Sequence, residues 1–278
     1  ALQQVLQSAK SQRVPTMTQL VDLIAINELL GTVESSGDGK NANLVAQLET
    51  ESLADKAAEF KTTNNDDTIG WIRIPNTNVD YPVVYKAGVE NYAYYESKGY
   101  DKQYSKDGVI WADYECTFPE LSQNTTLYGH NWHNIYTPRT QANMQANDLM
   151  FSLVMSYNYT DFAQENPFIY FSTTEQDYVF QVFASYYTDL NFGYNYAQMS
   201  QEDFQKVIAE AKAKSLSNYN VPVTSEDKIV TLSTCTRVHG NTNNQRFVVM
   251  AKLVPVGTPS TTISTHSNPI AYNSSIDA

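Results

Sequence analysis

The sequence predicts a mainly β fold: an eight-stranded closed barrel with an N-terminal helical segment and one helix inserted between two late strands. From Asp67 onward, short runs of β-branched and aromatic residues alternate with turn-forming residues, which is the pattern of successive strands. The chain contains eight such runs, enough to close a barrel. The predicted strands are residues 69–74, 79–85, 108–113, 124–130, 167–172, 177–187, 228–235 and 246–254.

The first 66 residues have a helical pattern instead. Apolar residues recur at near-helical spacing from Met17 to Leu30, and a second such pattern covers residues 42–60. The stretch "GTVESSGDGKN" between them is rich in residues that interrupt helices. We therefore expect residues 1–66 to form a helical segment that packs on the barrel of residues 67–254.

Two more helices are expected among the strands, over residues 143–162 and 200–215. Ser200 and Asp203 resemble a capping box at the start of the second helix, and its apolar residues fall on one face that can cover the barrel. Residues 255–278 are rich in Ser, Thr and Pro and predict a loosely held tail.

Composition limits the possible partners. Of the 278 residues, 42% are hydrophobic and 17% are charged, which allows a substantial core. The net charge of −12 argues against nucleic acid and against an anionic membrane surface. No apolar run approaches the roughly 20 residues of a membrane span. Two cysteines allow at most one disulfide bond.

The stretch "TLSTCTRVHG", residues 231–240, ends a predicted strand on Cys235. A sheet holds a cysteine at a strand end rigidly, while its thiol can still face a cleft. Taken alone, a buried structural cysteine is the commoner case, because a free cysteine packs as a small hydrophobe. A reactive thiol therefore needs support from other residues.

His130 and Arg246 give that support. His130 ends the predicted strand 124–130, so it can meet Cys235 at one rim of a barrel and act as its proton carrier. Arg246 opens the strand after Cys235 and returns level with it if the two strands pair. Its guanidinium could then stabilise an oxyanion. Judged alone, His130 is equally consistent with an ordinary surface or core histidine, and Arg246 is more often a strand-edge arginine in solvent.

Metal binding is a weaker interpretation. His130-x-x-His133 is half of a site, and Cys235-x-x-x-His239 is no better supported, because no further ligand stands at a familiar zinc spacing. We expect no metal and no cofactor. Cys116 is interpreted as a loop or core cysteine. A Cys116–Cys235 disulfide stays open as an alternative, and it would remove the nucleophile.

Three motifs together resemble the sortases, the cysteine transpeptidases of Gram-positive cell surfaces. They are "TLSTC", the arginine that opens the next strand, and the upstream "YGHN". "GWIRIPNTNVDYPVVY", residues 70–85, is similar to the segment with which class B sortases begin their barrel. The helical lead-in and the helix from Ser200 are also class B features. Cys116 and the tail after Val254 are not required by the family pattern.

The resemblance implies a role for each site residue. Cys235 matches the nucleophile, His130 the catalytic histidine and Arg246 the catalytic arginine. The residues that would flank the histidine or shape the substrate groove are Leu127, Tyr128, Asn131, Ser233 and Thr234.

The resemblance also implies a reaction and a place. The enzyme would cleave a Thr–X bond in a sorting motif of the Asn-Pro-x-Thr kind, and join the acyl group to an amine of a peptidoglycan precursor or a pilin lysine. Its partners would be surface proteins or pilins with a C-terminal sorting motif. It would work at the extracellular face of the cytoplasmic membrane, in the cell envelope of a Gram-positive bacterium. A membrane anchor is expected in the full-length protein, outside this chain.

Two other functions remain open. One is a cysteine peptidase or hydrolase of the cell surface, although the papain-like "CGSCW" and caspase-like "QACRG" signatures are absent. The other is a non-enzymatic surface β-domain, for which the loss of Cys235 would change nothing.

Overall fold

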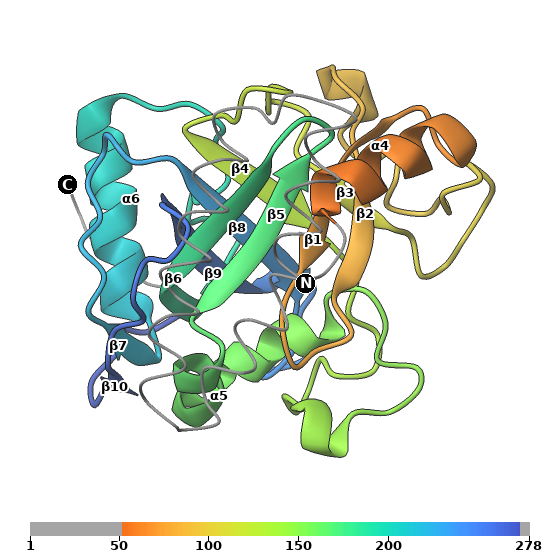
Figure 1. Cartoon of the computed structure of the whole chain (residues 1–278). Coiled ribbons are helices and arrows are strands. Elements are labelled where there is room, and N and C mark those ends of the chain that lie inside the picture. Colours follow the sequence, from red (N-terminus) through yellow and green to blue (C-terminus); the bar gives the residue numbers. More distant parts are fainter. Residues whose placement is uncertain (1–51, 273–278) are drawn as a thin grey trace, which may run out of the picture. The chain divides into compact units, whose positions relative to one another are not determined.

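The chain, described from residue 52 to residue 272 by a computed structural model, closes its strands into a barrel in the order β1-β2-β3-β4-β8-β9-β6-β5 (Figure 1). This confirms the predicted eight-stranded barrel. The barrel strands are β1 (Thr68–Arg73), β2 (Asp80–Val84), β3 (Ile110–Ala112), β4 (Asn124–Tyr128), β5 (Phe168–Thr173), β6 (Asp177–Asp189), β8 (Ile229–Cys235) and β9 (Gln245–Val254).

Two of the strand pairs are parallel, β2 with β3 and β4 with β8, and the others are antiparallel. The parallel pairing of β4 with β8 sets Tyr128 opposite Ser233, so the carboxyl ends of both strands reach the same rim. The antiparallel pairing of β8 with β9 brings the start of β9 back to that rim. The topology therefore gathers three chain segments at one end of the barrel.

The barrel interior is filled by large apolar side chains. Ile72, Leu127, Phe171, Leu232 and Phe247 are all fully buried. In β8, every residue from Ile229 to Thr234 is buried and only the last, Cys235, is exposed. Such a strand is fixed by packing along nearly its whole length, which gives its final residue a rigid base.

Helix α4 (Leu53–Thr63) precedes the barrel and packs on β1 through Leu53, Ala54 and Ala57 (Figure 1). The Ser52 hydroxyl caps its N-terminus by accepting a hydrogen bond from the Asp55 amide at 3.2 Å. Helix α4 overlaps the end of the second helical stretch expected over residues 42–60, of which residues 42–51 lie outside the described residues. The stretch Met17–Leu30 lies outside the described residues.

Helix α6 (Gln201–Lys214) is the helix inserted between two late strands, as predicted. The Ser200 hydroxyl accepts a hydrogen bond from the Asp203 amide at 3.1 Å and so caps the first turn. Phe204, Ile208 and Ala211 form its buried face. Within residues 52–272, no helix is both long and apolar enough to cross a membrane.

The prediction of a single helix over residues 143–162 is wrong. The segment instead contains one 3₁₀ helix and the start of a short α-helix, and another 3₁₀ helix ends where the segment begins. Met150 has a φ of 53°, which no right-handed helix can contain. The buried Asp148 carboxylate accepts hydrogen bonds from Arg139 Nη1 and the Gln145 amide, both at 2.8 Å, and so stabilises a non-helical turn. The observed elements are η2 (Gln141–Asn143), η3 (Ser152–Asn158) and α5 (Thr160–Glu165).

The segment after β9 also differs from the loose tail expected. Strand β10 (Ile263–Thr265) pairs antiparallel with β7 (Ser217–Tyr219) in a separate two-stranded sheet. Ile263 is buried there. The backbone of β7 provides hydrogen-bond partners for the tail. The tail is therefore held in place despite its polar composition. The tail is ordered against the body of the protein as far as Tyr272.

Candidate active site

Cys235 ends β8 with its thiol exposed and unbridged. The two residues before it, Ser233 and Thr234, are each only 2% exposed. The Thr234 hydroxyl donates a hydrogen bond to the Gly129 carbonyl at 2.7 Å, and the Ser233 hydroxyl shares one with Tyr194 at 2.8 Å. The backbone that carries the sulfur is therefore held tightly, while the sulfur itself stays accessible.

Cys116 is the opposite case. It is 2% exposed, and burial raises the pKa of its thiol to about 12. The thiol lies 3.9 Å from the Asn124 carbonyl oxygen. This confirms the prediction of a loop or core cysteine. Both cysteines are free, so the alternative of a Cys116–Cys235 disulfide is wrong.

The parallel pairing of β4 with β8 brings His130 to the cysteine. Because Tyr128 stands opposite Ser233, the residue two positions after Tyr128 comes level with the residue two positions after Ser233. These are His130 and Cys235. Asn131 ties the two segments together, because its Nδ2 donates a hydrogen bond to the Cys235 carbonyl at 3.3 Å.

One hydrogen bond fixes the tautomer of His130. Its Nε2 lies 2.6 Å from the Glu96 carbonyl oxygen. A carbonyl oxygen can only accept a hydrogen bond, so Nε2 must carry a proton. In the neutral ring, Nδ1 is then the nitrogen that can take up a proton. The segment between η1 (Val89–Asn91) and β3 therefore orients a candidate acid–base catalyst through its backbone.

The ring of His130 is also packed between two indoles. Trp132 stacks on it at 4.9 Å between ring centroids, and Trp111 lies tilted at 5.8 Å. The Trp132 Nε1 donates to the Lys106 carbonyl at 3.0 Å. Gly108 lies close beside the imidazole. At its φ of 58°, a Cβ atom there would stand 2.9 Å from His130 Cδ2. Only glycine leaves the imidazole its present position.

Arg246 is the direct cross-strand partner of Cys235. Its Nη1 donates hydrogen bonds to the carbonyl oxygens of Asn243 and Gln245, both at 2.9 Å. Burial raises the pKa of Tyr194, Arg246 opposes that rise, and Cys235 adds to it. Both groups thus lie near the same buried hydroxyl. A cation and a thiol at this rim are suited to stabilising a developing oxyanion beside a nucleophile.

The five residues expected around the groove divide by burial. Leu127 is fully buried, so its side chain packs in the barrel and cannot contact a peptide. Asn131, Ser233 and Thr234 are at most 3% exposed. Tyr128 is partly exposed, and its hydroxyl donates to Asp113 Oδ2 at 2.7 Å and accepts from Asn195 Nδ2 at 2.9 Å.

One surface hollow lies away from these residues. Its volume is about 730 Å³, and it includes Gln123 and Lys228 at the amino ends of β4 and β8. The candidate site is at the carboxyl ends of the same strands. Sequence reasoning missed several groups at that end. Trp132 stands two residues after His130 and could have been noticed, whereas the Glu96 carbonyl carries no side-chain signal.

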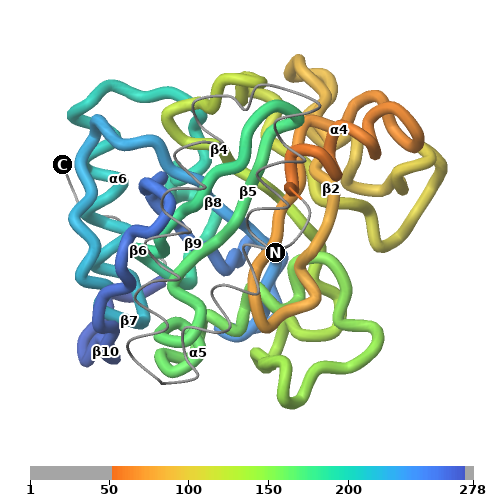
Figure 2. The backbone as a smooth tube through the Cα atoms, viewed as in Figure 1, coloured from red at the N-terminus to blue at the C-terminus, as the bar shows by residue number. Residues whose placement is uncertain are grey.

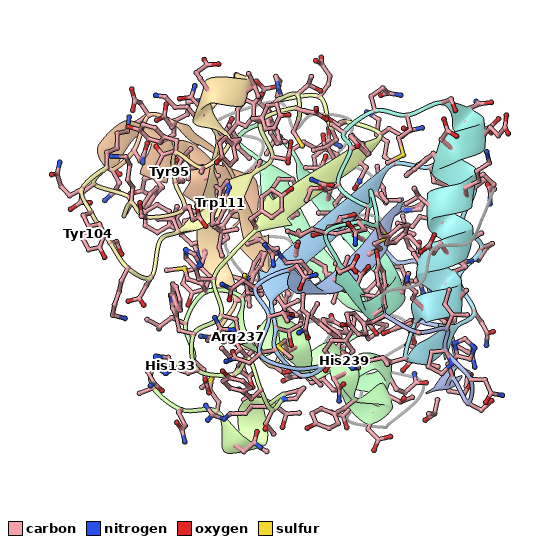
Figure 3. All side chains as sticks on the ribbon, turned by 180° about the vertical axis from the view of Figure 1, so that it is seen from behind. Tyr95, Tyr104, Trp111, His133, Arg237 and His239 are labelled. Atoms are coloured by element: carbon pink, nitrogen blue, oxygen red, sulfur yellow. The ribbon has the colours of Figure 1, made fainter. Side chains whose placement is uncertain are left out.

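His133 and His239 come from the two weakly supported metal patterns, and among the described residues neither belongs to a cluster of metal ligands. Within residues 52–272, no group of three or more His, Cys, Asp or Glu side chains could hold a metal. Figure 3 shows Arg237 and His239 on the loop after β8, and His133 on the loop after β4. The Arg237 amide donates to the Ile135 carbonyl at 2.8 Å and joins the two loops.

Known proteins that are similar to this chain in sequence and fold share one description. A family model described as a sortase domain matches residues 72–254. Sortase B of Staphylococcus aureus is 31% identical over 193 residues, which are 69% of this chain and 72% of that protein. Sortase B of Listeria monocytogenes is 29% identical over 191 residues, with coverages of 68% and 71%. A crystal structure of the S. aureus protein superposes with a TM-score of 0.59 at 30% identity, covering 72% of this chain and 87% of that one.

Proposed function

Because this chain belongs to the sortase family of cysteine transpeptidases, we propose that Cys235 attacks a sorting peptide and passes its acyl group to an amine. One observation supports this most strongly. Cys235 is an exposed thiol at the end of a buried strand, with Arg246 directly opposite it in the next strand. Cys116 is buried and lacks such partners.

In the first half-reaction, the Cys235 thiol passes its proton to Nδ1 of His130, and the thiolate attacks the carbonyl carbon of a Thr–X bond and forms a tetrahedral oxyanion. The Arg246 guanidinium stabilises that negative charge. His130 gives a proton to the departing amine as the C–N bond breaks, which leaves a thioester on Cys235. Nδ1 is suited to this transfer, because the Glu96 carbonyl engages Nε2.

In the second half-reaction, an amine attacks the thioester carbonyl and loses a proton to His130. Collapse of the tetrahedral intermediate forms the new amide and releases the Cys235 sulfur. The thiolate is thereby regenerated, and no cofactor takes part.

For the substrate, we propose a sorting motif of the Asn-Pro-x-Thr kind on a surface protein or pilin. The acceptor would be an amine of a peptidoglycan precursor or a pilin lysine. The site would work at the cell envelope of a Gram-positive bacterium, on the extracellular face of the membrane. Tyr128, Asn131, Ser233 and Thr234 would support the groove from beneath, because they are buried or already hydrogen-bonded.

The test is acyl-enzyme formation read by intact mass. An Asn-Pro-x-Thr peptide should add its acyl mass to the protein, whereas a Leu-Pro-x-Thr-Gly peptide should add less. Equal or better acylation by the Leu-Pro peptide would overturn the substrate assignment alone. No covalent adduct with any sorting peptide would favour the non-enzymatic alternative.

A further inference from the structure

Residues 263–272, here called the strap, cross the C-terminal end of α6. The strap begins with β10 beside β7 (Figure 2). The pairing continues beyond the strands, because the His266 amide donates to the Leu216 carbonyl and the Ile270 amide to the Ala213 carbonyl, both at 3.0 Å. The strap therefore runs antiparallel to residues 213–219, the segment at the end of α6 and just after it.

A buried lysine fixes the far end of the strap. The side chain of Lys214, the last residue of α6, is 0% exposed and pairs with Glu210 at 3.3 Å. Its Nζ donates to the carbonyl oxygens of Ala271 and Tyr272, both at 3.1 Å. A charged donor in a buried position makes strong hydrogen bonds, so the backbone of Tyr272 is anchored.

The anchored Tyr272 packs on the loop that follows the candidate nucleophile. Its ring stacks on His239 at 4.5 Å between centroids, with 8° between the ring planes. Tyr187 of β6 meets the same imidazole edge-on at 4.9 Å. Burial lowers the pKa of His239, which favours the neutral form of the ring. The strap and β6 thus hold His239 from two directions.

His239 is connected to Arg246 through one buried side chain. The His239 amide donates to Gln245 Oε1 at 3.0 Å, and Gln245 is only 1% exposed. Gln245 Nε2 donates to the Gly240 carbonyl at 2.7 Å. The carbonyl oxygens that hold Arg246 Nη1 belong to Asn243 and to Gln245 itself. A shift of His239 would therefore move the carbonyl groups that orient the guanidinium.

We propose that Tyr272 is a positioning residue, and that the strap sets the orientation of Arg246 through His239 and Gln245. This inference rests on the proposed role of Arg246 in stabilising the oxyanion. Tyr272 touches neither the peptide nor the reacting atoms. Its contribution is the loop geometry in which the guanidinium is held.

The experiment compares Tyr272→Ala with Tyr272→Phe, which keeps the stacked ring. Tyr178→Ala is the matched control. Tyr178 is also partly exposed, but it lies near the start of β6, whereas Asp189, at the end of β6, is the strand partner of Gln245. We expect Tyr272→Ala to slow acylation by the sorting peptide on the order of tenfold to a hundredfold, since a small misplacement of a catalytic group has effects of that size. Tyr272→Phe and Tyr178→Ala should acylate at close to the parent rate.

Two further readouts separate positioning from simple destabilisation. Amide hydrogen exchange of residues 236–244 should rise in Tyr272→Ala and stay unchanged in Tyr272→Phe. Alkylation of Cys235 by iodoacetamide should keep its rate, because that reaction forms no oxyanion. Unchanged exchange with unchanged acylation in Tyr272→Ala would overturn the inference.

A double mutant tests the connection to the arginine. Arg246→Lys keeps the charge but loses the planar fork, and we expect it to slow acylation by about 10²–10³. Adding Tyr272→Ala to Arg246→Lys should cause little further loss, because both changes act through the same group. Fully additive losses would show that the strap does not act through Arg246. A lysine variant at parental activity would instead show that the charge alone suffices at position 246, so that no orientation of the guanidinium remains for the strap to set.

Discussion

At the scale of single residues, the two cysteines carry the same thiol in opposite surroundings. Cys235 is exposed at a strand end, whereas Cys116 is 2% exposed and burial raises its pKa to about 12. The thiolate is the reactive form, so a raised pKa keeps Cys116 neutral and inert. Reactivity is thus decided by the position of each residue in the barrel.

We therefore expect iodoacetamide at about pH 8 to label Cys235 and not Cys116 in the folded protein, since only the thiolate reacts. Labelling of Cys116 should require unfolding, or a pH that approaches the raised pKa of about 12. Cys235→Ala should abolish both labelling and turnover, and Cys116→Ala should leave turnover nearly unchanged. Mass spectrometry of the labelled peptides gives the site. Turnover by Cys235→Ala would contradict the assignment of the nucleophile.

A second residue-scale prediction concerns the position of His130. In Gly108→Ala, the new Cβ would stand 2.9 Å from both His130 Cδ2 and the Glu96 oxygen, so the imidazole must move off its carbonyl partner. We expect kcat/KM to fall on the order of tenfold to a hundredfold.

Gly257→Ala is the control for this change. Gly257 also has a positive φ, 82°, but a Cβ there meets nothing within 4 Å. It should carry a similar backbone strain, of about 1 kcal/mol, without touching the histidine. Equal losses of activity in the two alanine variants would mean that strain alone explains the effect.

Sequence patterns predicted residues whose position follows from a strand end. Cys235 closes β8, Arg246 lies next to the start of β9, and both boundaries are visible as changes in residue type. The groups that orient them were not visible. The Glu96 carbonyl acts through the backbone, and the stacking of Tyr272 on His239 joins segments that no local pattern connects.

At the scale of elements, the barrel strands were predictable, whereas β7, β10 and the irregular segment 143–162 were not. β6, β8 and β9 have enough apolar and β-branched residues to give a clear signal. β7 and β10 have three residues each, too few for any periodicity. In the segment 143–162, hydrogen bonds of the Asp148 side chain compete with the backbone bonds of a helix, and helical periodicity does not reveal that competition.

The element-scale prediction concerns the end of α6. Lys214→Ala removes a fully buried ammonium that serves Glu210 and two carbonyl groups of the strap. Because it leaves a buried carboxylate with less compensation, we expect the free energy of unfolding to fall by about 3–5 kcal/mol. Urea denaturation measures this change.

Lys206→Ala is the matched control on the same helix. Lys206 pairs with Glu202 at 3.1 Å, but its side chain is 44% exposed. Exposed pairs of this kind contribute little, so the free energy of unfolding should change by about 0.5 kcal/mol or less. Equal effects of the two substitutions would mean that the buried pair does not anchor the strap.

At the scale of the whole molecule, the side-by-side pairing of β4, β8 and β9 is what assembles the site. His130 follows β4, Cys235 ends β8 and Arg246 lies in β9, and these three strands are neighbours in the closed sheet. The eight strands themselves were predictable, but the parallel pairing of β4 with β8 was not, because about a hundred residues separate their partners. Local patterns contain no information on such pairing, and the family resemblance implied only that Cys235, His130 and Arg246 act in one site.

The last prediction concerns the acceptor, which a nucleophile, an acid–base group and a cation do not determine by themselves. The exposed thiol of Cys235 places its thioester within reach of both water and amines. If the enzyme is a transferase, two half-reactions share one acyl-enzyme, so kinetics with peptide and amine should be ping-pong. Raising the amine concentration should speed turnover and replace the free carboxylate with the amide product.

Hydroxylamine gives the sharpest form of this test, because it is a small, strong nucleophile that traps a thioester as a hydroxamate. The leaving peptide should be released at the same rate as acyl product appears, and its release should not require the amine in a single turnover. Cys235→Ala should yield no hydroxamate. If the turnover rate depends on neither the amine nor hydroxylamine and only carboxylate is formed, this chain is a hydrolase with a transpeptidase fold.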